Sequence, residues 1–303
     1  MVLINYLVEE SSRVLLNHKY VIITPIRDEE AFIEKTLKSV TSQTILPVEW
    51  IIVDDGSTDR TGQIIDEYAE HYSWIHVVHR ENRGFRSSGG GVIEAFYAGY
   101  NVLNEKDWNF LVKLDGDLAF DADYFEKIFE YFRQSQGLGV AGGEIYNIVN
   151  GVQMLEKCPL FHVRGATKIY KRECWDAIDG LLVAPGWDTL DEVKANMLGW
   201  TTRTFPDLKL IHHKFTGSAD GTWGGWVKNG RANYIAGYHP LFMTLKCLKR
   251  AFQRPYIIGA LALYYGFITG YLAGVQQVPD PALIRYLRKQ QLNKIFMRET
   301  IWE

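Results

Sequence analysis

The stretch KLDGDL at residues 113–118, read together with VDDGSTD at residues 53–59, decides the architecture of this chain. Apolar residues at 51–53 and 110–112 lead into the two acidic segments, and each run predicts a buried strand that ends in carboxylates. In Asp115-Gly116-Asp117 two carboxylates stand at i and i+2, separated by a residue that takes any backbone angle. Hard oxygen ligands of this kind suit Mg²⁺ or Mn²⁺. We therefore expect Asp115 and Asp117 to bind a divalent metal beside an anionic nucleotide.

Strands and helices alternate along the first part of the chain. Strands are expected over 19–24, 48–53, 75–79 and 110–114, and helices over 29–42, 59–72 and 92–104. This order predicts an α/β fold with a mainly parallel sheet and helices on both faces. Ligands bind such sheets at the carboxyl ends of the strands, where Asp28, Asp55 and Asp115 fall. Further strands are expected over 140–148, 167–170, 201–205 and 208–213, and a helix over 190–198.

Composition narrows the class of protein. The 303 residues carry a net charge of −3, and no basic groove motif, zinc spacing or RNP-like run indicates nucleic-acid binding. Three cysteines without paired spacing are typical of reduced thiols in a cytosolic protein. Residues 1–16 lack the long apolar core of a secretory signal and are expected to form a short amphipathic helix.

Four motifs, in this order, resemble those of family 2 glycosyltransferases: TPIRDEE at 24–30, VDDGSTD at 53–59, DGD at 115–117, and GWDTLDE at 186–192 followed by Gly199-Trp200. The resemblance covers roughly residues 20 to 215. It implies the GT-A fold, a Rossmann-like sheet, and metal-dependent inverting transfer from a nucleotide sugar. The Gln-x-x-Arg-Trp motif of processive synthases is absent, and residues 230–234 occupy that region. Transfer of a single sugar is therefore favoured over polymerisation.

The resemblance also implies which residues bind the donor. Asp115 and Asp117 would hold the metal and the pyrophosphate, with Asp115 also near the ribose. Asp54 and Asp55 would bind the base and ribose, because a carboxylate accepts directional hydrogen bonds from them. The remaining donor contacts are expected from the first motif and from the loop after residue 79, namely Pro25, Arg27, Glu29, Arg83 and Arg86.

Two features of these donor motifs leave alternatives open. Arg27 stands where the family often has an aromatic residue and Asp28 replaces Asn, so Arg27 either stacks on the base or pairs with Asp55. Uridine is the default base, with guanosine and thymidine as alternatives. Arg83 and Arg86 lie in a loop whose Asn82-Arg83-Gly84 resembles the family's Asn-x-Gly, and a solvated arginine is an equal alternative for each. Ser57 to Asp59 are expected to cap the next helix.

The catalytic base is expected in the fourth motif. Inverting transfer needs a carboxylate that takes the proton of the acceptor hydroxyl. Asp188 matches the family's base position, counted back from the Gly-aromatic pair, and Asp191 is the competing candidate. Glu192 is expected to interact with the helix dipole. His212 and His213 are candidate third metal ligands, and since neighbouring strand residues face opposite sides, at most one of them takes part.

The tail has a different character from the motif region. Residues 221–279 contain no Asp or Glu, and Tyr256 to Val275 is an uncharged, mostly apolar run. We expect a catalytic domain over 1–225 and a helical, membrane-seeking segment over 226–303, either peripheral or monotopic at the cytoplasmic face. A packed cap, a dimer interface and a true span are the alternatives. A lipid-linked or cell-envelope glycan is therefore the expected acceptor.

Three rival functions remain. A polyprenyl-phosphate sugar synthase shares the Asp115 to Leu118 pattern, but its phosphate acceptor needs no base. A nucleotidyltransferase usually carries a Gly-rich basic loop after its first strand, whereas residues 25–29 are acidic and lack glycine. A non-catalytic sugar-nucleotide binder would not need the full acidic set.

Overall fold

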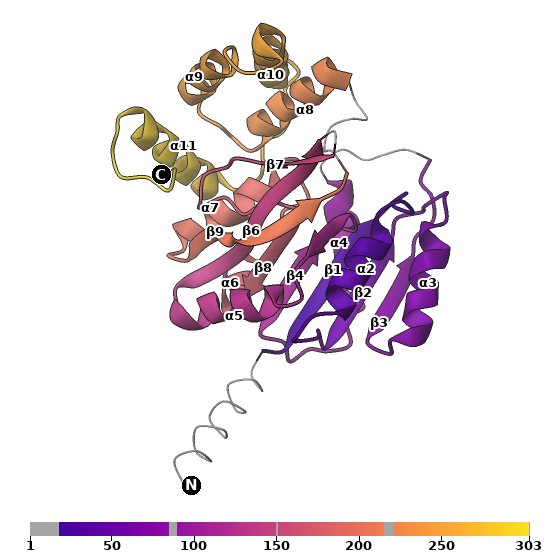
Figure 1. The fold of residues 1–303 in the computed structure, drawn as a ribbon. Helices are drawn as coiled ribbons and strands as arrows, with labels where there is room; N and C mark the ends of the chain where they lie inside the picture. The colour runs from indigo at the N-terminus through magenta and orange to yellow at the C-terminus, as the bar shows by residue number, and fades with distance from the viewer. Residues whose placement is uncertain (1–17, 85–89, 150, 215–220, 303) are drawn as a thin grey trace, which may run out of the picture.

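The computed structural model describes residues 18–84, 90–149, 151–214 and 221–302, and within them a single curved sheet carries most of the core (Figure 1). The sheet order is β3-β2-β1-β4-β8-β6-β9-β5, with β7 paired to β6. The strands are β1 (Tyr20–Ile26), β2 (Glu49–Asp54), β3 (Ile75–His79), β4 (Phe110–Leu114), β5 (Leu118–Phe120), β6 (Leu138–Val149), β7 (Val152–Leu155), β8 (Thr167–Lys171) and β9 (Thr201–His212). The predicted helix over 1–16 lies outside the described residues.

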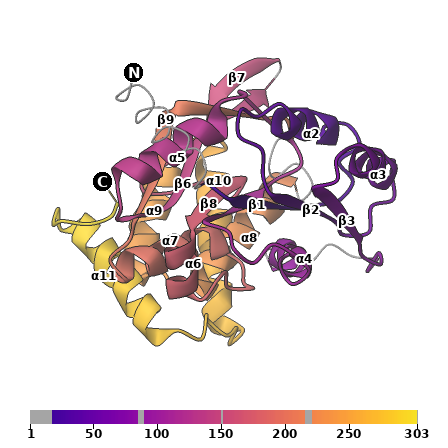
Figure 2. The same cartoon turned by 90° about the horizontal axis from the view of Figure 1, so that it is seen from below.

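Helices cover both faces of this sheet, as predicted (Figure 2). One face buries α2 (Ile33–Thr41), α3 (Thr61–His71) and α5 (Tyr124–Gln134). The other buries α4 (Gly91–Tyr100), α6 (Arg172–Ile178) and α7 (Trp187–Met197). Strands β1, β2 and β4 are buried along their whole length because helices lie on both of their sides.

The expectation of a mainly parallel sheet holds for only half of the molecule. Strands β3, β2, β1 and β4 are parallel to one another, whereas β8 is antiparallel to both β4 and β6, and β5 is antiparallel to β9. The sheet is therefore mixed. The two strands expected over 201–205 and 208–213 form one strand, β9, whose irregularity opposite β6 accommodates residues 206–208.

Among the described residues after β9, four helices pack together above the sheet (Figure 1). They are α8 (Gly221–Ile235), α9 (Pro240–Arg250), α10 (Tyr256–Leu272) and α11 (Pro281–Ile295). Their core includes Leu190 and Val193 of α7, so these helices share a hydrophobic cluster with the motif region. The predicted domain boundary after residue 225 falls inside α8. In the described ranges, no helix has both the length and the apolar character needed to cross a membrane.

Candidate active site

Three side chains of the kinds that can ligate a metal meet where β4 and β9 end. Asp115 and Asp117 follow β4, and His212 is the last residue of β9. The antiparallel pairing of β5 with β9 places Leu118 opposite His212, which brings the histidine to the acidic turn. His212 Nε2 lies 3.0 Å from Asp117 Oδ2, and one ligand atom from each of the three residues lies within 4.8 Å of the others. The strand register therefore assembles an Asp-Asp-His cluster.

The glycine between the two aspartates is required by close packing. A Cβ on Gly116 would lie 2.5 Å from Ile26 Cγ2 and 3.1 Å from Ile33 Cδ1, and both of these side chains are buried. Gly116 has no positive φ, so the expected need for backbone freedom is not the reason for glycine here. The turn instead lies against β1 and α2, which fixes the spacing of the two carboxylates.

The cluster contains polar atoms that have no protein partner. Asp117 Oδ1 and His212 Nδ1 are buried and make no hydrogen bond. Burial and the nearby Asp117 charge raise the pKa of Asp115, although the Lys113 ammonium opposes this. Burial would lower the pKa of His212, but the hydrogen bond to Asp117 outweighs it and raises this pKa. A buried carboxylate oxygen without a partner is costly, so the donor set fits a divalent cation.

Lys113 is a site residue that the motifs did not predict. It lies inside β4 and is 2% exposed, with its ammonium on the Asp115 carboxylate and hydrogen-bonded to the Gly165 carbonyl. The same Nζ lies 5.4 Å from the centre of the Trp187 ring. The signal in the sequence was a single lysine in an otherwise apolar strand. Lys113 links the metal cluster to the first turn of α7, where Asp188 lies.

His213 lies on the other side of β9 from His212, as strand alternation predicts. Its ring stacks on Phe32 at 6.0 Å, and Nδ1 lies 3.2 Å from Lys35 Nζ. Only its backbone N–H reaches the acidic turn, donating to the Asp117 carbonyl at 2.9 Å. Of the two histidines, His212 is the one in the candidate metal cluster.

A second buried carboxylate stands beside the cluster. Glu29 accepts a 2.6 Å hydrogen bond from Lys214 Nζ through Oε1, while its Oε2 is buried without a partner. Burial raises the pKa of Glu29 to about 7, and the charges of Asp117 and Asp115 add to this effect while Lys214 opposes it. Lys214 was not predicted, although it directly follows His212-His213 in the sequence.

Asp55 is held by two arginines from the loop after β3. Arg80 Nη1 donates to Asp55 Oδ1 at 2.6 Å, and Arg83 Nη2 donates to Oδ2 at 2.7 Å. Arg83 also lies 2.5 Å from Glu94 of α4. Asp54 accepts from the Ser57 backbone N–H at 2.8 Å and lies 3.1 Å from His79 Nδ1. Arg86 lies outside the described residues.

The first two motifs are bound to each other by hydrogen bonds. Pro25 is paired with Val53 in the β1–β2 register, and Asp28 accepts from the Thr58 backbone at 2.8 Å. The hydroxyl of Ser57 accepts from the Asp28 N–H, so it fixes the neighbouring loop and does not cap α3, whose N-cap is Arg60.

Two residues of the first motif have special local geometry. Asp28 has φ of 53°, a left-handed conformation that Asp and Asn tolerate best among residues with a Cβ. Asp therefore meets the same backbone requirement as the Asn that the family often has here. Arg27 Nη2 donates to Asn82 Oδ1 at 2.8 Å, and Arg27 Nε lies 3.7 Å from Asp28.

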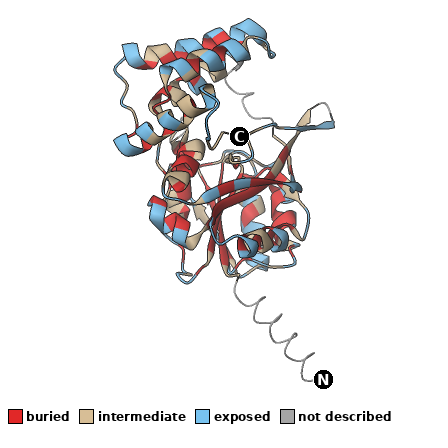
Figure 3. Ribbon diagram, turned by 90° about the vertical axis from the view of Figure 1, so that its left-hand side faces the viewer, coloured by how far each residue is buried: buried red, intermediate tan, exposed pale blue. Residues whose placement is uncertain are grey.

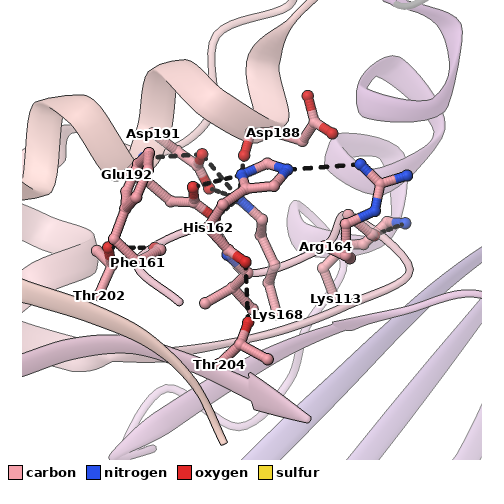
Figure 4. Close-up of polar contacts among 12 residues, drawn as sticks. Lys113, Phe161, His162, Arg164, Lys168, Asp188, Asp191, Glu192, Thr202 and Thr204 are labelled. Atoms are coloured by element: carbon pink, nitrogen blue, oxygen red, sulfur yellow. Dashed lines mark hydrogen bonds and ion pairs between the residues drawn. The ribbon is translucent and has the colours of Figure 1, made fainter. Parts of the chain in front are cut away.

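Asp188 lies in the first turn of α7, which begins three residues before the predicted start. Gly186 precedes the helix with φ of 86°, so glycine permits this entry. The Asp188 carboxylate lies near the side chains of His162 and Arg164 and interacts with them through charge (Figure 4). Burial would raise the pKa of Asp188, but the charges of His162, Lys168 and Arg164 outweigh it and lower the pKa below its usual range.

Asp191 and Glu192 belong to a closed buried network (Figure 4). Lys168 Nζ lies 2.8 Å from both oxygens of Asp191 and 2.7 Å from Glu192 Oε1. Tyr170 donates to Asp191 at 2.5 Å, and Glu192 accepts from the Val163 N–H at 2.7 Å. Burial raises the pKa of Asp191 to about 6, with Lys168 opposing. Glu192 was expected at the helix dipole only, yet it anchors the 162–163 segment.

Comparison with known proteins identifies relatives of the motif region. The sequence model of glycosyl transferase family 2 matches residues 21–172, half of this chain. Glycosyltransferase GlyA of Streptococcus pneumoniae is 28% identical over 151 residues, which are 50% of this chain and 20% of that protein. The putative teichuronic acid biosynthesis glycosyltransferase TuaG of Bacillus subtilis is 34% identical over 113 residues, 37% and 41% of the two chains. This chain thus spans less than half of these relatives.

A solved structure supports the architecture over nearly the whole chain. The mannosyltransferase PcManGT from Pyrobaculum calidifontis, in complex with GDP-Man and Mn²⁺, superposes with a TM-score of 0.55 at 16% identity. The superposition covers 93% of this chain and 84% of that one, so the GT-A-type arrangement of strands and helices is shared. From the family match together with this fold, we conclude that the chain belongs to glycosyl transferase family 2.

Proposed function

We propose that this chain is a metal-dependent inverting glycosyltransferase that moves one sugar from a nucleotide sugar to a hydroxyl of a cell-envelope or lipid-linked glycan. The observation that carries this proposal is the Asp115-Asp117-His212 cluster with its unpartnered Asp117 Oδ1 and His212 Nδ1. A divalent cation held there would neutralise charge on the leaving nucleoside diphosphate. The imidazole in the set favours Mn²⁺ over Mg²⁺.

The nucleoside would lie against the Asp54–Asp55 loop. Asp55 is oriented by Arg80 and Arg83, which leaves its outer lone pairs available to a base or ribose donor. Arg27, on the neighbouring loop, offers a planar guanidinium on which a base can stack. The structural relative bound to GDP-Man keeps guanosine among the candidates beside uridine and thymidine.

Lys214 would contact the diphosphate. Its ammonium donates a hydrogen bond to Glu29, and burial together with the charges of Asp117 and Asp115 raises the pKa of that carboxyl. An incoming diphosphate offers this ammonium stronger anionic partners, and the Lys214–Glu29 pair would hold the lysine ready for them.

Asp188 is favoured over Asp191 as the base. Asp191 is 4% exposed and both of its oxygens are committed to Lys168 and Tyr170, so it is unable to accept a proton without breaking that network. Asp188 makes only charge interactions through its carboxylate, and its lowered pKa keeps it ionised at neutral pH. Asp188 would then receive the acceptor's hydroxyl proton as the sugar is transferred.

Calorimetric titration tests the donor site directly. UDP, GDP and dTDP are each titrated with Mn²⁺ and with EDTA into the wild type and Asp117→Ala. Asp121→Ala, an exposed carboxylate four residues away, is the matched control. We expect one diphosphate to bind with metal only, and only Asp117→Ala to lose it. Absence of binding by all three would sink the proposal and favour another nucleotide class.

A polyprenyl-phosphate acceptor is the second candidate. Arg164 lies near Asp188, and its guanidinium suits a phosphate as well as it suits the carboxylate (Figure 4). A phosphate oxygen attacks without losing a proton and needs no base. If Asp188→Asn keeps full activity with a polyprenyl phosphate, this second function replaces the first.

A further inference from the structure

The outer side of helices α9 and α10 exposes a large apolar surface. Side chains between 42% and 85% exposed recur along it, and we name them the α9–α10 face: Leu241, Leu245, Leu248, Phe252, Ile257, Ile258, Leu261, Tyr265 and Leu272. Residues 241, 245 and 248 follow helical spacing on α9, and 257, 261, 265 and 272 do so on α10. Each helix therefore presents one continuous apolar stripe to solvent.

Both stripes point away from the catalytic body. The opposite sides of the helices, with Met243 and Cys247 on α9 and Leu263 and Phe267 on α10, are buried in the core shared with α7 and α11. Because these inward sides meet one cluster, the exposed sides lie on the outside of the molecule (Figure 3). Exposed apolar patches of this kind usually mark an interaction site.

Charge identifies the partner of the α9–α10 face. Residues 221–279 contain no Asp or Glu, while three exposed basic residues lie on α9 or in the turn before α10: Lys246, Lys249 and Arg254. The surface therefore complements a partner that is apolar and negatively charged. Tyr256, Tyr264, Tyr265 and Trp223 add the amphipathic aromatic rings that are favoured where lipid meets water.

We propose that the α9–α10 face docks on an anionic lipid surface, with α9 and α10 lying in the plane of the headgroups. Their lengths, 11 and 17 residues, suit helices that lie on a bilayer. Basic side chains attract the anionic headgroups, and the apolar stripes enter the acyl boundary. This inference assigns a surface to the membrane location expected above, and it does not require the proposed sugar transfer.

Vesicle flotation of the full chain tests this docking. We expect binding to vesicles of phosphatidylcholine with 30% phosphatidylglycerol to exceed binding to phosphatidylcholine alone by about tenfold or more, and to weaken as salt is added. Phe252→Ser/Ile257→Ser should lower binding by about tenfold or more. Lys249→Glu/Arg254→Glu should lower it by about 30-fold, and only on anionic vesicles.

The controls separate docking from folding and from catalysis. Leu46→Ser/Val102→Ser removes two exposed apolar side chains, 45% and 48% exposed, from the catalytic half and should leave flotation unchanged. Each variant is also tested for thermal unfolding and for nucleotide binding, which should match the wild type. Intact nucleotide binding without flotation would overturn the docking alone. A dimer in light scattering that the Phe252→Ser/Ile257→Ser pair abolishes would instead make the face an interface between copies.

Discussion

Two buried acidic clusters on neighbouring elements behave in opposite ways. In the cluster of Asp115, Asp117 and His212, buried polar atoms lack partners. In the cluster of Lys168, Asp191 and Glu192, the carboxylates are met by an ammonium, a phenol and backbone N–H groups. Both look alike as sequence, since each is a pair of acids near a strand or helix end. Burial and charge do not distinguish the two clusters. What distinguishes them is whether the buried polar atoms have hydrogen-bond partners: those of a ligand site lack them, and those of a structural network have them.

The largest expected effect comes from removing a carboxylate of the Asp115-Asp117-His212 cluster. Asp117→Ala removes the oxygen that has no protein partner, so we expect kcat/KM to fall by about 10⁴-fold as charge stabilisation of the leaving group is lost. Thermal stability without metal should change little. Added Mn²⁺ at about 100 times its Kd should stabilise the wild type by about 2.7 kcal/mol and the variant not at all. An equal metal response in both proteins would mean that the ion binds elsewhere.

In the Lys168-Asp191-Glu192 cluster, a substitution should lower the stability of the fold. Lys168→Met leaves two buried carboxylates without their cation, and we expect the free energy of unfolding to fall by about 3–5 kcal/mol in urea denaturation. Exposed Lys127→Met, whose ion pair with Asp123 lies at the surface, is the control and should cost about 1 kcal/mol or less. A Lys168→Met protein as stable as the wild type would refute the structural role of this network.

Asp188 belongs to neither cluster. Its carboxylate interacts with the charges of both Lys113, beside the first cluster, and Lys168, in the second. Asp188→Asn should lower kcat by about 10²- to 10³-fold with little change in donor binding. Asp191→Asn should lower stability more than it lowers kcat per folded molecule. Kinetics corrected for the folded fraction distinguish the two, and the reverse pattern would make Asp191 the base.

A smaller effect is expected at the diphosphate end of the first cluster. Lys214→Gln removes an ammonium, and donor KM should rise by about tenfold while kcat changes less. Lys209→Gln, an exposed lysine on β9, the strand that precedes Lys214, serves as control. If the donor KM of Lys214→Gln is unchanged, Lys214 does not contact the diphosphate and serves only to pair with Glu29.

The smallest effect is a shift in pH dependence. The positive charge of Arg164 helps to lower the pKa of Asp188, and Asp188 must be ionised to act as a base. Arg164→Gln should therefore raise that pKa, so the acidic limb of the kcat profile moves upward by about 0.5 to 1 pH unit. Arg203→Gln, exposed on β9, should leave the profile in place. A downward shift would contradict the assigned sign.

Local pattern predicted the parallel half of the fold closely. Strands β3 and β4 begin and end at the predicted residues, because apolar runs between polar loops leave one arrangement that buries them. Helix α5 was not expected, although Phe125, Ile128, Phe129 and Phe132 follow helical spacing and are buried. The split of β9 was predicted wrongly, because Pro206-Asp207 resembles a turn, whereas an irregularity of β9 opposite β6 accommodates these residues within one strand.

The candidate site was predictable only where a motif carries it. Asp115 and Asp117 meet in one cluster as their motif predicted, and alternation predicted that only one of His212 and His213 would join them. The donor role expected of Asp55 stays a prediction. Lys113, Lys168 and Lys214 escaped prediction, since a lysine in a strand gives no sign of its partner before the register is known. Which carboxylate each lysine pairs with depends on contacts between strands and helices that are distant in the sequence, and the local sequence does not show these contacts.

The hydrophobic cluster that Leu190 and Val193 of α7 share with the C-terminal helices has a practical consequence for dissecting this protein. Cutting the chain at residue 225 would divide α8 and remove the helices that bury Leu190 and Val193 of α7, the helix that carries Asp188. A shortened enzyme would then lose activity through a melted α7 even with every motif residue present. Deletion results at this end would therefore report on folding, and the point variants of the α9–α10 face are the safer probe of its role.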